Sequence, residues 1–274
     1  MTIVLDGDLV LAGAGNMGGA MLAGWLARGL DPARIIVQDP SPPPAVAALL
    51  KAHGIAAHAA VPNRPNPPAV LLMAVKPQIM DEVFPPLARL AGPETVVLSI
   101  AAGKTIASFE RHLPRPGAVV RSIPNTPASV GRGITVATAN AHVTARQKAL
   151  CDGLLRAIGE VAWVEDEALI DPVTAVSGSG PAYVFYLVEC LAAAGVEAGL
   201  APDLAQKLAR WTVAGAGELL HRSDLSAEQL RKNVTSPNGT TYAALQVLMA
   251  ETGLQPLMTE AVLAATRRSR ELAN

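Results

Sequence analysis

Over the first 165 residues, short runs of β-branched and other apolar residues alternate with longer segments whose apolar positions recur at helical spacing. This alternation is typical of a parallel α/β sheet in which helices connect successive strands. The stretch between His58 and Pro68 breaks the rhythm, because its prolines and asparagines predict a surface loop. The predicted strands are 9–12, 34–38, 69–75, 95–100, 118–122, 134–138 and 161–164.

The pattern changes after about residue 165. Strand-like runs stop, and long segments rich in alanine and leucine follow, with prolines where helices would begin. We therefore predict an α/β domain of the Rossmann type over residues 1–165 and an all-helical domain over residues 166–274. The longest apolar segment, around residues 182–200, contains Glu189 and Glu197, which favours a buried helix over a membrane span.

Composition indicates a small-molecule partner. The 274 residues carry 22 basic and 23 acidic side chains, a net charge of −1, without the charge runs expected for binding nucleic acid or an acidic membrane. Cys151 and Cys190 lie far apart without CxxC spacing or a histidine cluster, so neither a disulfide framework nor a metal site is predicted. The N-terminus lacks the features of a signal peptide, and we expect a cytoplasmic protein.

Three glycines follow the first predicted strand at the spacing of a dinucleotide fingerprint. Gly13-Ala-Gly15-Asn-Met-Gly18 lies between that strand and a helix predicted to run to about residue 28. The first glycine of such a loop permits the turn, the second lets backbone approach a pyrophosphate, and the third allows close packing of the helix. This context predicts a nicotinamide dinucleotide.

Asp39 ends the second predicted strand. An acidic side chain at that position binds the adenosine ribose hydroxyls, which favours NADH over NADPH. Ser41 is placed to contact a 2′-phosphate instead, and an ordinary Asp-Pro turn also explains Asp39.

Further strand ends carry sequences suited to a ligand at the same edge of the sheet. Ala101 and Ala102 leave room for a flat ring, and Asn125 offers a hydrogen-bonding amide to a carboxamide or ribose. Lys76 offers positive charge to phosphate or substrate, although a solvated surface lysine is an equally good interpretation. The segments concerned are Ala-Val-Lys-Pro at 74–77, Ser-Ile-Ala-Ala-Gly at 99–103 and Pro-Asn-Thr-Pro at 124–127.

Residues 234–241 place four hydroxyls and a tight turn before an apolar segment with helical spacing. Gly239, Thr240 and Thr241 are predicted to open that helix, whose first N–H groups lack internal partners and lie at the positive end of the helix dipole. A small anion such as a carboxylate fits this position. The alternative is an ordinary Ser/Thr helix cap.

These motifs occur together, in this order, in one known family. The chain resembles pyrroline-5-carboxylate reductases over nearly its whole length, through GAGNMG at 13–18, AVKP at 74–77, SIAAG at 99–103, PNTPA at 124–128, AVSGSGPAYVF at 175–185 and the turn at 234–241. The resemblance implies a Rossmann domain followed by a helical dimerisation domain that interlocks with a second subunit. It also implies that dimers assemble further, commonly into decamers.

The implied reaction transfers a hydride from NADPH or NADH to C5 of 1-pyrroline-5-carboxylate and yields proline. Because a protonated imine is already electrophilic, the protein mainly has to align two molecules and hold the carboxylate, without a histidine pair or a metal. Thr241 is the candidate catalytic residue, either delivering a proton or only positioning the ring.

The motifs and the resemblance together give the candidate site residues. The predicted substrate site consists of Glu167, Ser236, Gly239, Thr240 and Thr241. The predicted cofactor site consists of Ala12, Gly13, Ala14, Gly15, Asn16, Met17, Gly18, Asp39, Ser41, Asn63, Ala74, Val75, Lys76, Pro77, Ile100, Ala101, Ala102, Asn125 and Asn233. A solvated acid and a helix C-cap are the alternatives for Glu167 and Asn233.

Two residues depart from the family pattern. Asp39 stands where many relatives place Ser or Thr for the NADPH phosphate, and Asn238 stands where relatives usually have Gly. Asn is the non-glycine residue that best tolerates positive φ, so the turn is expected to form.

Two other functional classes share part of this pattern. A β-hydroxyacid dehydrogenase shares the two-domain plan but relies on a catalytic lysine in a glycine-rich helix of its second domain. The comparable helix here, after Gly180, reads Ala-Tyr-Val-Phe-Tyr-Leu-Val-Glu-Cys and contains no lysine, which argues against this class. A non-catalytic nicotinamide-binding sensor is the second, and the intact Thr240 and Thr241 argue against it.

Overall fold

The computed structural model describes residues 3, 5–62 and 65–273, which pack as two compact units. The first unit combines Met1–Gly178 with Thr266–Asn274, and the second is Ser179–Ala265. The units therefore divide later than residue 165, because Ile170 packs with Ile123 and Val136 in a core cluster of the first unit.

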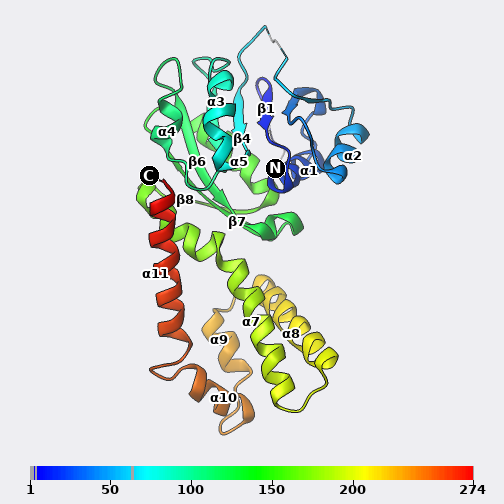
Figure 1. The fold of residues 1–274 in the computed structure, drawn as a ribbon, viewed down its shortest axis with the longest axis vertical. Coiled ribbons are helices and arrows are strands. Elements are labelled where there is room, and N and C mark those ends of the chain that lie inside the picture. Colours follow the sequence, from blue (N-terminus) through cyan, green and yellow to red (C-terminus); the bar gives the residue numbers. More distant parts are fainter. Residues whose placement is uncertain (1–2, 4, 63–64, 274) are drawn as a thin grey trace. The chain divides into compact units, whose positions relative to one another are not determined.

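A doubly wound sheet forms the centre of the first unit (Figure 1). Its described strands follow the order β3-β2-β1-β4-β5-β6-β7-β8, and every neighbouring pair is parallel except β6 with β7. The strand order reverses between β1 and β4, the switch point at which such sheets bind ligands. The strands are β1 (Leu9–Ala12), β2 (Ile35–Gln38), β3 (Ala57–His58), β4 (Val70–Met73), β5 (Val96–Ser99), β6 (Ala118–Pro124), β7 (Gly133–Ala139) and β8 (Gly159–Trp163).

Helices cover both faces of this sheet, since alternate residues of each buried strand point to opposite faces. Leu9 and Leu11 of β1 belong to one core cluster with Trp25, whereas Val10 belongs to another with Phe84. The first cluster includes residues of α1 (Asn16–Ala27), α2 (Pro44–Ala52) and α5 (Ala145–Leu155), and the second includes residues of α3 (Met80–Ala88) and α4 (Ile106–Glu110).

Short helical turns connect these elements and lead out of the sheet. The 3₁₀ turns are η1 (Pro32–Arg34), η2 (Pro77–Ile79), η3 (Thr126–Val130), η4 (Arg156–Ile158) and η5 (Glu167–Leu169). They are followed by α6 (Ile170–Val173) and a π-helical turn, η6 (Thr174–Gly178).

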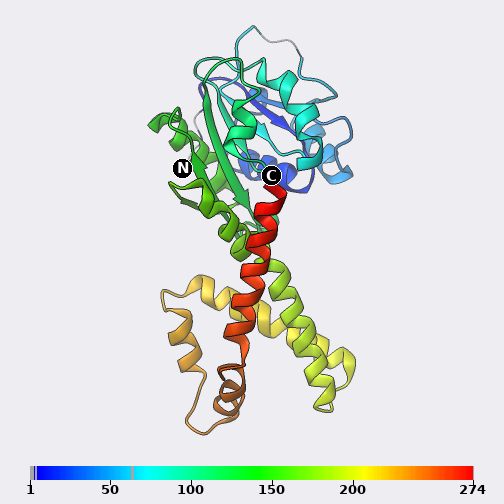
Figure 2. The same cartoon turned by 60° about the vertical axis from the view of Figure 1, so that its left-hand side comes forward.

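The second unit is helical, as predicted, and Figure 2 shows its helices from a second direction. It contains α7 (Gly180–Glu197), α8 (Pro202–Arg222), α9 (Ala227–Asn233), α10 (Thr240–Leu248) and the first part of α11 (Leu254–Ala273). Helices α7 and α8 approach closely at small residues, because a Cβ added at Gly195 would lie 3.3 Å from that of Ala205.

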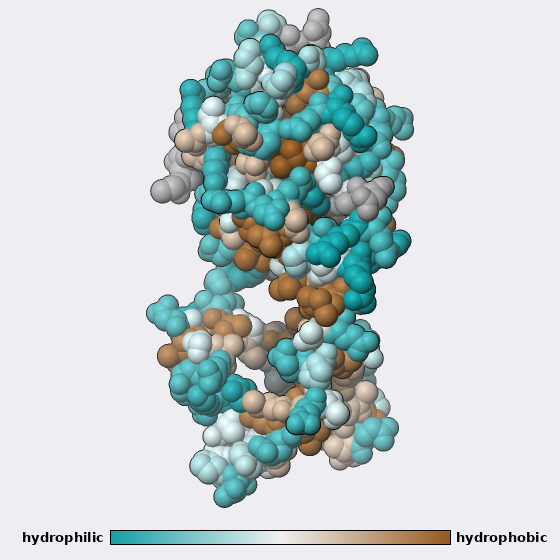
Figure 3. Space-filling view, turned by 90° about the vertical axis from the view of Figure 1, so that its left-hand side faces the viewer, coloured by the Kyte–Doolittle hydropathy of each residue, from teal (hydrophilic) through white to brown (hydrophobic). Residues whose placement is uncertain are grey.

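The expectation that residues 182–200 form a buried helix is wrong for the single chain. Ala192 is the one fully buried residue in α7 among those described, while Phe185 is 62% and Tyr186 66% exposed. Figure 3 shows apolar patches open on the surface of the helical unit. By length and composition alone, the helical stretch Glu167–Glu197 also meets the requirement for a membrane span. An exposed apolar helix needs a partner surface.

Candidate cofactor and substrate site

The glycine fingerprint has the geometry that its spacing predicted. Gly13, directly after β1, has a φ of +90°, and an added Cβ would lie 2.7 Å from the carbonyl oxygen of Ala74. A Cβ at Gly18 would collide with the carbonyl oxygen of Gly13, whereas one at Gly15 would meet no atom within 4 Å. Gly13 and Gly18 are thus required by the turn and the packing, and the backbone at Gly15 stays open to a ligand.

Helix α1 begins directly at this open position. Its N-cap is Gly15, and no side chain caps the helix there. Asn16 and Met17 are its first two residues, so their N–H groups lie at the positive end of a helix of 12 residues. Such an end binds phosphate groups.

Asp39 is joined to the fingerprint by hydrogen bonds. The backbone N–H of Ala14 donates to Oδ2 of Asp39 at 2.7 Å, and that of Ser41 donates to Oδ1 at 2.9 Å. The carboxylate is half-buried and keeps further lone pairs for ligand hydroxyls. Asp39 therefore fixes its own turn and the fingerprint loop at once, and it places a negative charge at the adenosine end of the predicted site.

The ends of β1, β4 and β5 lie next to one another in this edge of the sheet. The N–H of Ala74 donates to the carbonyl of Ala12 at 2.8 Å, and the N–H of Ile100 donates to that of Met73 at 3.1 Å. Ala101 is buried and Ala102 is exposed. The predicted residues Val75 and Pro77 are half-buried there.

Lys76 lies beside them with an exposed side chain. It precedes η2 and forms no ion pair with a described residue. Its charge is therefore available at the ligand edge of the sheet, as the prediction of a phosphate or substrate contact requires.

The side chain of Asn125 is used inside the protein. Its Oδ1 accepts a hydrogen bond from the N–H of Ile134 at 3.0 Å, and its Nδ2 donates to the carbonyl of Ser177 at 3.2 Å. These contacts show a structural role that the sequence did not reveal, while its cofactor role stays a prediction.

Glu167 lies in the first unit and bonds within it. Its Oε1 accepts hydrogen bonds from Nη1 of Arg121 at 2.7 Å and from the N–H of Ile106 at 2.9 Å. The predicted contact with the substrate is not tested by these bonds. Arg121 is not among the residues predicted from the sequence; its one signal there is an arginine inside the otherwise apolar run before Pro124.

The start of α10 has the geometry expected of an anion site. Gly239 is its N-cap, no side chain caps the helix, and Asn238 before it has a φ of +55°. An added Cβ at Gly239 would lie 2.5 Å from Oγ of Ser236, so this hydroxyl lies directly beside the helix start. The alternative of a Ser/Thr side-chain cap is therefore not realised, and the expectation that Asn238 accepts positive φ is confirmed.

The remaining predicted residues lie in the same turn or directly before it, except Asn63. Thr240 and Thr241 are the first two residues of α10, and Thr241 is half-buried. Asn233 ends α9, and its Oδ1 accepts a hydrogen bond from Nε2 of Gln229 at 2.8 Å. Asn63 lies outside the described residues. The turn belongs to the second unit and the fingerprint to the first.

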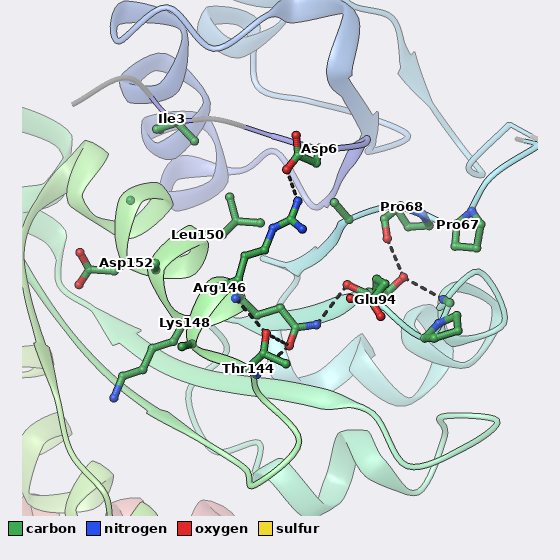
Figure 4. A pocket seen from close by; sticks show the side chains of 18 of the residues that line it. Ile3, Asp6, Pro67, Pro68, Glu94, Thr144, Arg146, Lys148, Leu150 and Asp152 are labelled. Atoms are coloured by element: carbon green, nitrogen blue, oxygen red, sulfur yellow. Dashed lines mark hydrogen bonds and ion pairs between the residues drawn. The ribbon is translucent and has the colours of Figure 1, made fainter.

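A cavity of about 1170 Å3 opens at the opposite, amino-end edge of the sheet. It is lined by residues that precede β1, β4 and β5 and by the start of α5, and Figure 4 shows Arg146 reaching Asp6 within it. None of the predicted cofactor or substrate residues that the structure describes lines this cavity. It is therefore separate from the nicotinamide edge.

A glycine fingerprint at the switch point of a doubly wound sheet, with an acidic residue at the end of β2, defines a nicotinamide-dependent oxidoreductase of the Rossmann type. Family models agree in both parts of the chain. Residues 167–272 match the model described as "Pyrroline-5-carboxylate reductase dimerisation", and residues 9–103 match "NADP oxidoreductase coenzyme F420-dependent".

Individual relatives make the assignment specific. The chain is 41% identical to a pyrroline-5-carboxylate reductase of Pseudomonas aeruginosa, over 97% of this chain and 96% of that one. It is similar to the structure of a pyrroline-5-carboxylate reductase from Coxiella burnetii, with 34% identity, a TM-score of 0.87 and coverage of 98% and 99%. A Plasmodium falciparum pyrroline carboxylate reductase with NADP bound is 26% identical, with a TM-score of 0.78 and coverage of 99% and 100%.

The chain belongs to the pyrroline-5-carboxylate reductase family. It is an NAD(P)H-dependent oxidoreductase with a small-molecule substrate, and its helical unit makes it a homo-oligomer.

Proposed function

We propose that the chain reduces 1-pyrroline-5-carboxylate to L-proline and holds the substrate carboxylate at the start of α10. The observation that carries this assignment of the substrate site is the uncapped end of α10, where Gly239 offers no side chain and Ser236 Oγ lies beside it. Free N–H groups at the positive end of a helix are a general solution for binding a carboxylate. The hydroxyl of Thr241 is placed in the first turn to contact the ring nitrogen.

Reduced nicotinamide, when bound, supplies the hydride that the imine carbon accepts. The residues of the chain bind and orient the two molecules, which lowers the barrier through proximity. The backbone at Gly15 and the start of α1 would hold the pyrophosphate, and Ala101 and Ala102 would leave space for the nicotinamide ring. The amine formed carries one N–H whose proton comes from solvent before the hydride arrives; Thr241 positions the ring nitrogen, or its hydroxyl relays that proton from water and is reprotonated by water.

We further propose that NADH is preferred over NADPH. The carboxylate of Asp39 is fixed by Ala14 and Ser41, so it cannot turn away from the adenosine ribose without breaking both hydrogen bonds. A 2′-phosphate at this position would meet a negative charge, and like charges repel.

The larger assembly and the cellular location are also part of the proposal. The helical unit belongs to a dimerisation family, and the resemblance implies that dimers assemble into decamers. A mass near ten times 28.3 kDa in light scattering would support the decamer. Cytoplasmic location agrees with two cysteines that are free in the structure.

The substitution Thr241→Ala tests the substrate site. It removes the hydroxyl while leaving the backbone N–H groups, so we expect kcat to fall or the KM for pyrroline-5-carboxylate to rise by about tenfold, with NADH affinity near normal. Thr259→Ala is the matched control, because Thr259 is an exposed threonine of α11 whose hydroxyl bonds to the carbonyl of Gln255. A loss of NADH binding in Thr241→Ala would contradict the role assigned to its hydroxyl.

A further inference from the structure

Arg121 is a charged residue inside the core of the sheet. It lies in β6 with only 3% of its side chain exposed, and its Nη1 pairs with Oε1 of Glu167 at 2.7 Å. A guanidinium is costly to bury unless it is paired and hydrogen-bonded. The position therefore needs an explanation that apolar packing does not provide.

Glu167 links Arg121 to the end of the loop that follows β5. The oxygen that pairs with Arg121 also accepts the N–H of Ile106, the first residue of α4. Residues 100–105, here called the cofactor loop, connect β5 to this point and contain the predicted nicotinamide contacts Ile100, Ala101 and Ala102. The ion pair thus fixes the far end of the cofactor loop to β6.

The near end of the cofactor loop is fixed independently. The N–H of Ile100 donates to the carbonyl of Met73 at 3.1 Å, and the N–H of Ala101 donates to Oγ of Ser99 at 3.2 Å. Ser122 Oγ donates to the carbonyl of Ser99 at 2.9 Å. The loop is consequently fixed at both ends, and only the far end, at Ile106, depends on a buried charge.

A further contact of the loop, made by Lys104 within it, ends on an exposed carboxylate and cannot replace that anchor. Lys104 Nζ bonds to Oδ2 of Asp81 at 2.8 Å, and this hydrogen bond holds the pKa of the Asp81 carboxyl below its usual value. Asp81 is largely exposed, however, and exposed pairs contribute little to rigidity or stability.

The burial of Arg121 carries a cost in stability. Its Nε and Nη2 are buried and donate to no residue that the structure describes. Unsatisfied buried donors destabilise a fold, and apolar replacements of buried ion pairs are often neutral or stabilising. Stability alone therefore does not account for an arginine at this position.

We propose that Arg121 is a positioning residue that acts through Glu167 to hold the cofactor loop in the conformation that receives the nicotinamide ring. The inference rests on the proposed function, because that function places the ring at this loop. On this account Glu167 serves the cofactor through Ile106, in contrast to the substrate contact that the family resemblance implies.

A double-mutant cycle tests the proposal, with Arg121→Met, Glu167→Gln and the two combined. Three quantities are measured: the Kd of NADH by fluorescence, the hydrogen exchange of peptides covering 100–110, and the KM values for both substrates. We expect each single change to weaken NADH binding by about tenfold and to speed exchange near Ile106, with less than about twofold change in the KM for pyrroline-5-carboxylate. The double variant should bind NADH no more weakly than the worse single variant, because both residues act through one contact.

Arg156→Met is the matched control. It removes an arginine that pairs with Asp152 in the same unit, away from the cofactor loop, and should leave NADH affinity unchanged. Should Arg121→Met fail to fold, Arg121→Lys and Glu167→Gln decide the same comparison. Arg121→Lys should then keep part of the wild-type affinity for NADH.

Three results would overturn the proposal. These are unchanged exchange near Ile106, additive losses in the cycle, or a raised KM for pyrroline-5-carboxylate with NADH affinity intact. NADH affinity and exchange need no turnover, so a wild-type protein that binds NADH but fails to reduce the imine would contradict the proposed function alone.

Discussion

At the scale of single residues, we propose that Asp39 sets the preference between NADH and NADPH. Its carboxylate accepts two backbone N–H groups and stands at the end of β2, where a 2′-phosphate would have to lie. We expect the wild type to have a higher kcat/KM with NADH than with NADPH. Asp39→Ser should lower the ratio of kcat/KM with NADH to kcat/KM with NADPH by about tenfold or more, because it removes the charge that repels the 2′-phosphate.

Asp31→Ser is the control for this comparison. Asp31 also accepts a backbone N–H, from Ala33 at 2.9 Å, but it lies at an exposed turn before β2. Its substitution should leave the NADH/NADPH ratio unchanged. A wild type that strongly prefers NADPH would show that Asp39 has been misinterpreted.

Some residue contacts were predictable from the sequence and others were not. The positive φ of Asn238 could be expected because relatives usually have Gly at this position and Asn is the non-glycine residue that best tolerates that conformation. The bonds of Asn125 to Ile134 and Ser177 could not be foreseen, since they join segments that only the fold brings together. The pairing of Arg121 with Glu167 escaped prediction for the same reason.

At the scale of elements, most strands of the sheet were predicted correctly because they are short, apolar and followed by turns. All seven predicted strands are present, and β1 has the predicted bounds Leu9–Ala12. The two-residue strand β3 was missed, because Ala57–His58 is too short to show any alternation of apolar and polar residues. For α10, the sequence predicted the start at Gly239 but left open whether a side chain would cap it.

The buried thiol of Cys151 in α5 should make the free energy of unfolding fall with pH in alkaline solution. Burial raises the pKa of Cys151 from 9.0 to about 12, with a smaller contribution from the charge of Asp152. The folded state therefore keeps the proton when the unfolded chain has lost it. The resulting stabilisation of the protonated thiol is complete below about pH 9 and is lost as the pH rises towards 12.

Urea denaturation between pH 8 and pH 11 measures this effect at a fixed protein concentration. The free energy of unfolding should fall with pH more steeply in the wild type than in Cys151→Ala, by up to about 1.4 kcal/mol per pH unit above pH 9. Cys190→Ala removes an exposed thiol and serves as the control. Parallel slopes for the wild type and Cys151→Ala would contradict the assignment.

At the scale of the whole molecule, the helical unit has too little buried surface to be explained as a single chain. Trp211 is 69% and Phe185 62% exposed, although aromatic side chains of this size normally stabilise cores and interfaces. The match to a dimerisation family accounts for this exposure. The apolar composition of residues 182–200 predicted burial, which the single chain does not provide, and the match to a dimerisation family points to a second subunit as the partner surface.

Trp211→Glu tests this account of the apolar surface. A charge in a subunit interface is costly to bury, so the variant should dissociate towards 28.3 kDa in size-exclusion chromatography with light scattering. Val130→Glu makes a similar change at an exposed apolar residue of η3 in the first unit and should leave the mass unchanged. Equal masses for the wild type and Trp211→Glu would show that Trp211 does not lie in a subunit interface.

The central claim concerns the reaction itself. The most direct measurement follows the absorbance of reduced nicotinamide when the purified protein meets pyrroline-5-carboxylate, with proline identified as the product. We predict oxidation of NADH, and more slowly of NADPH, with one proline formed for each nicotinamide oxidised. A folded protein that binds either nicotinamide but oxidises neither in the presence of the imine would contradict the assignment.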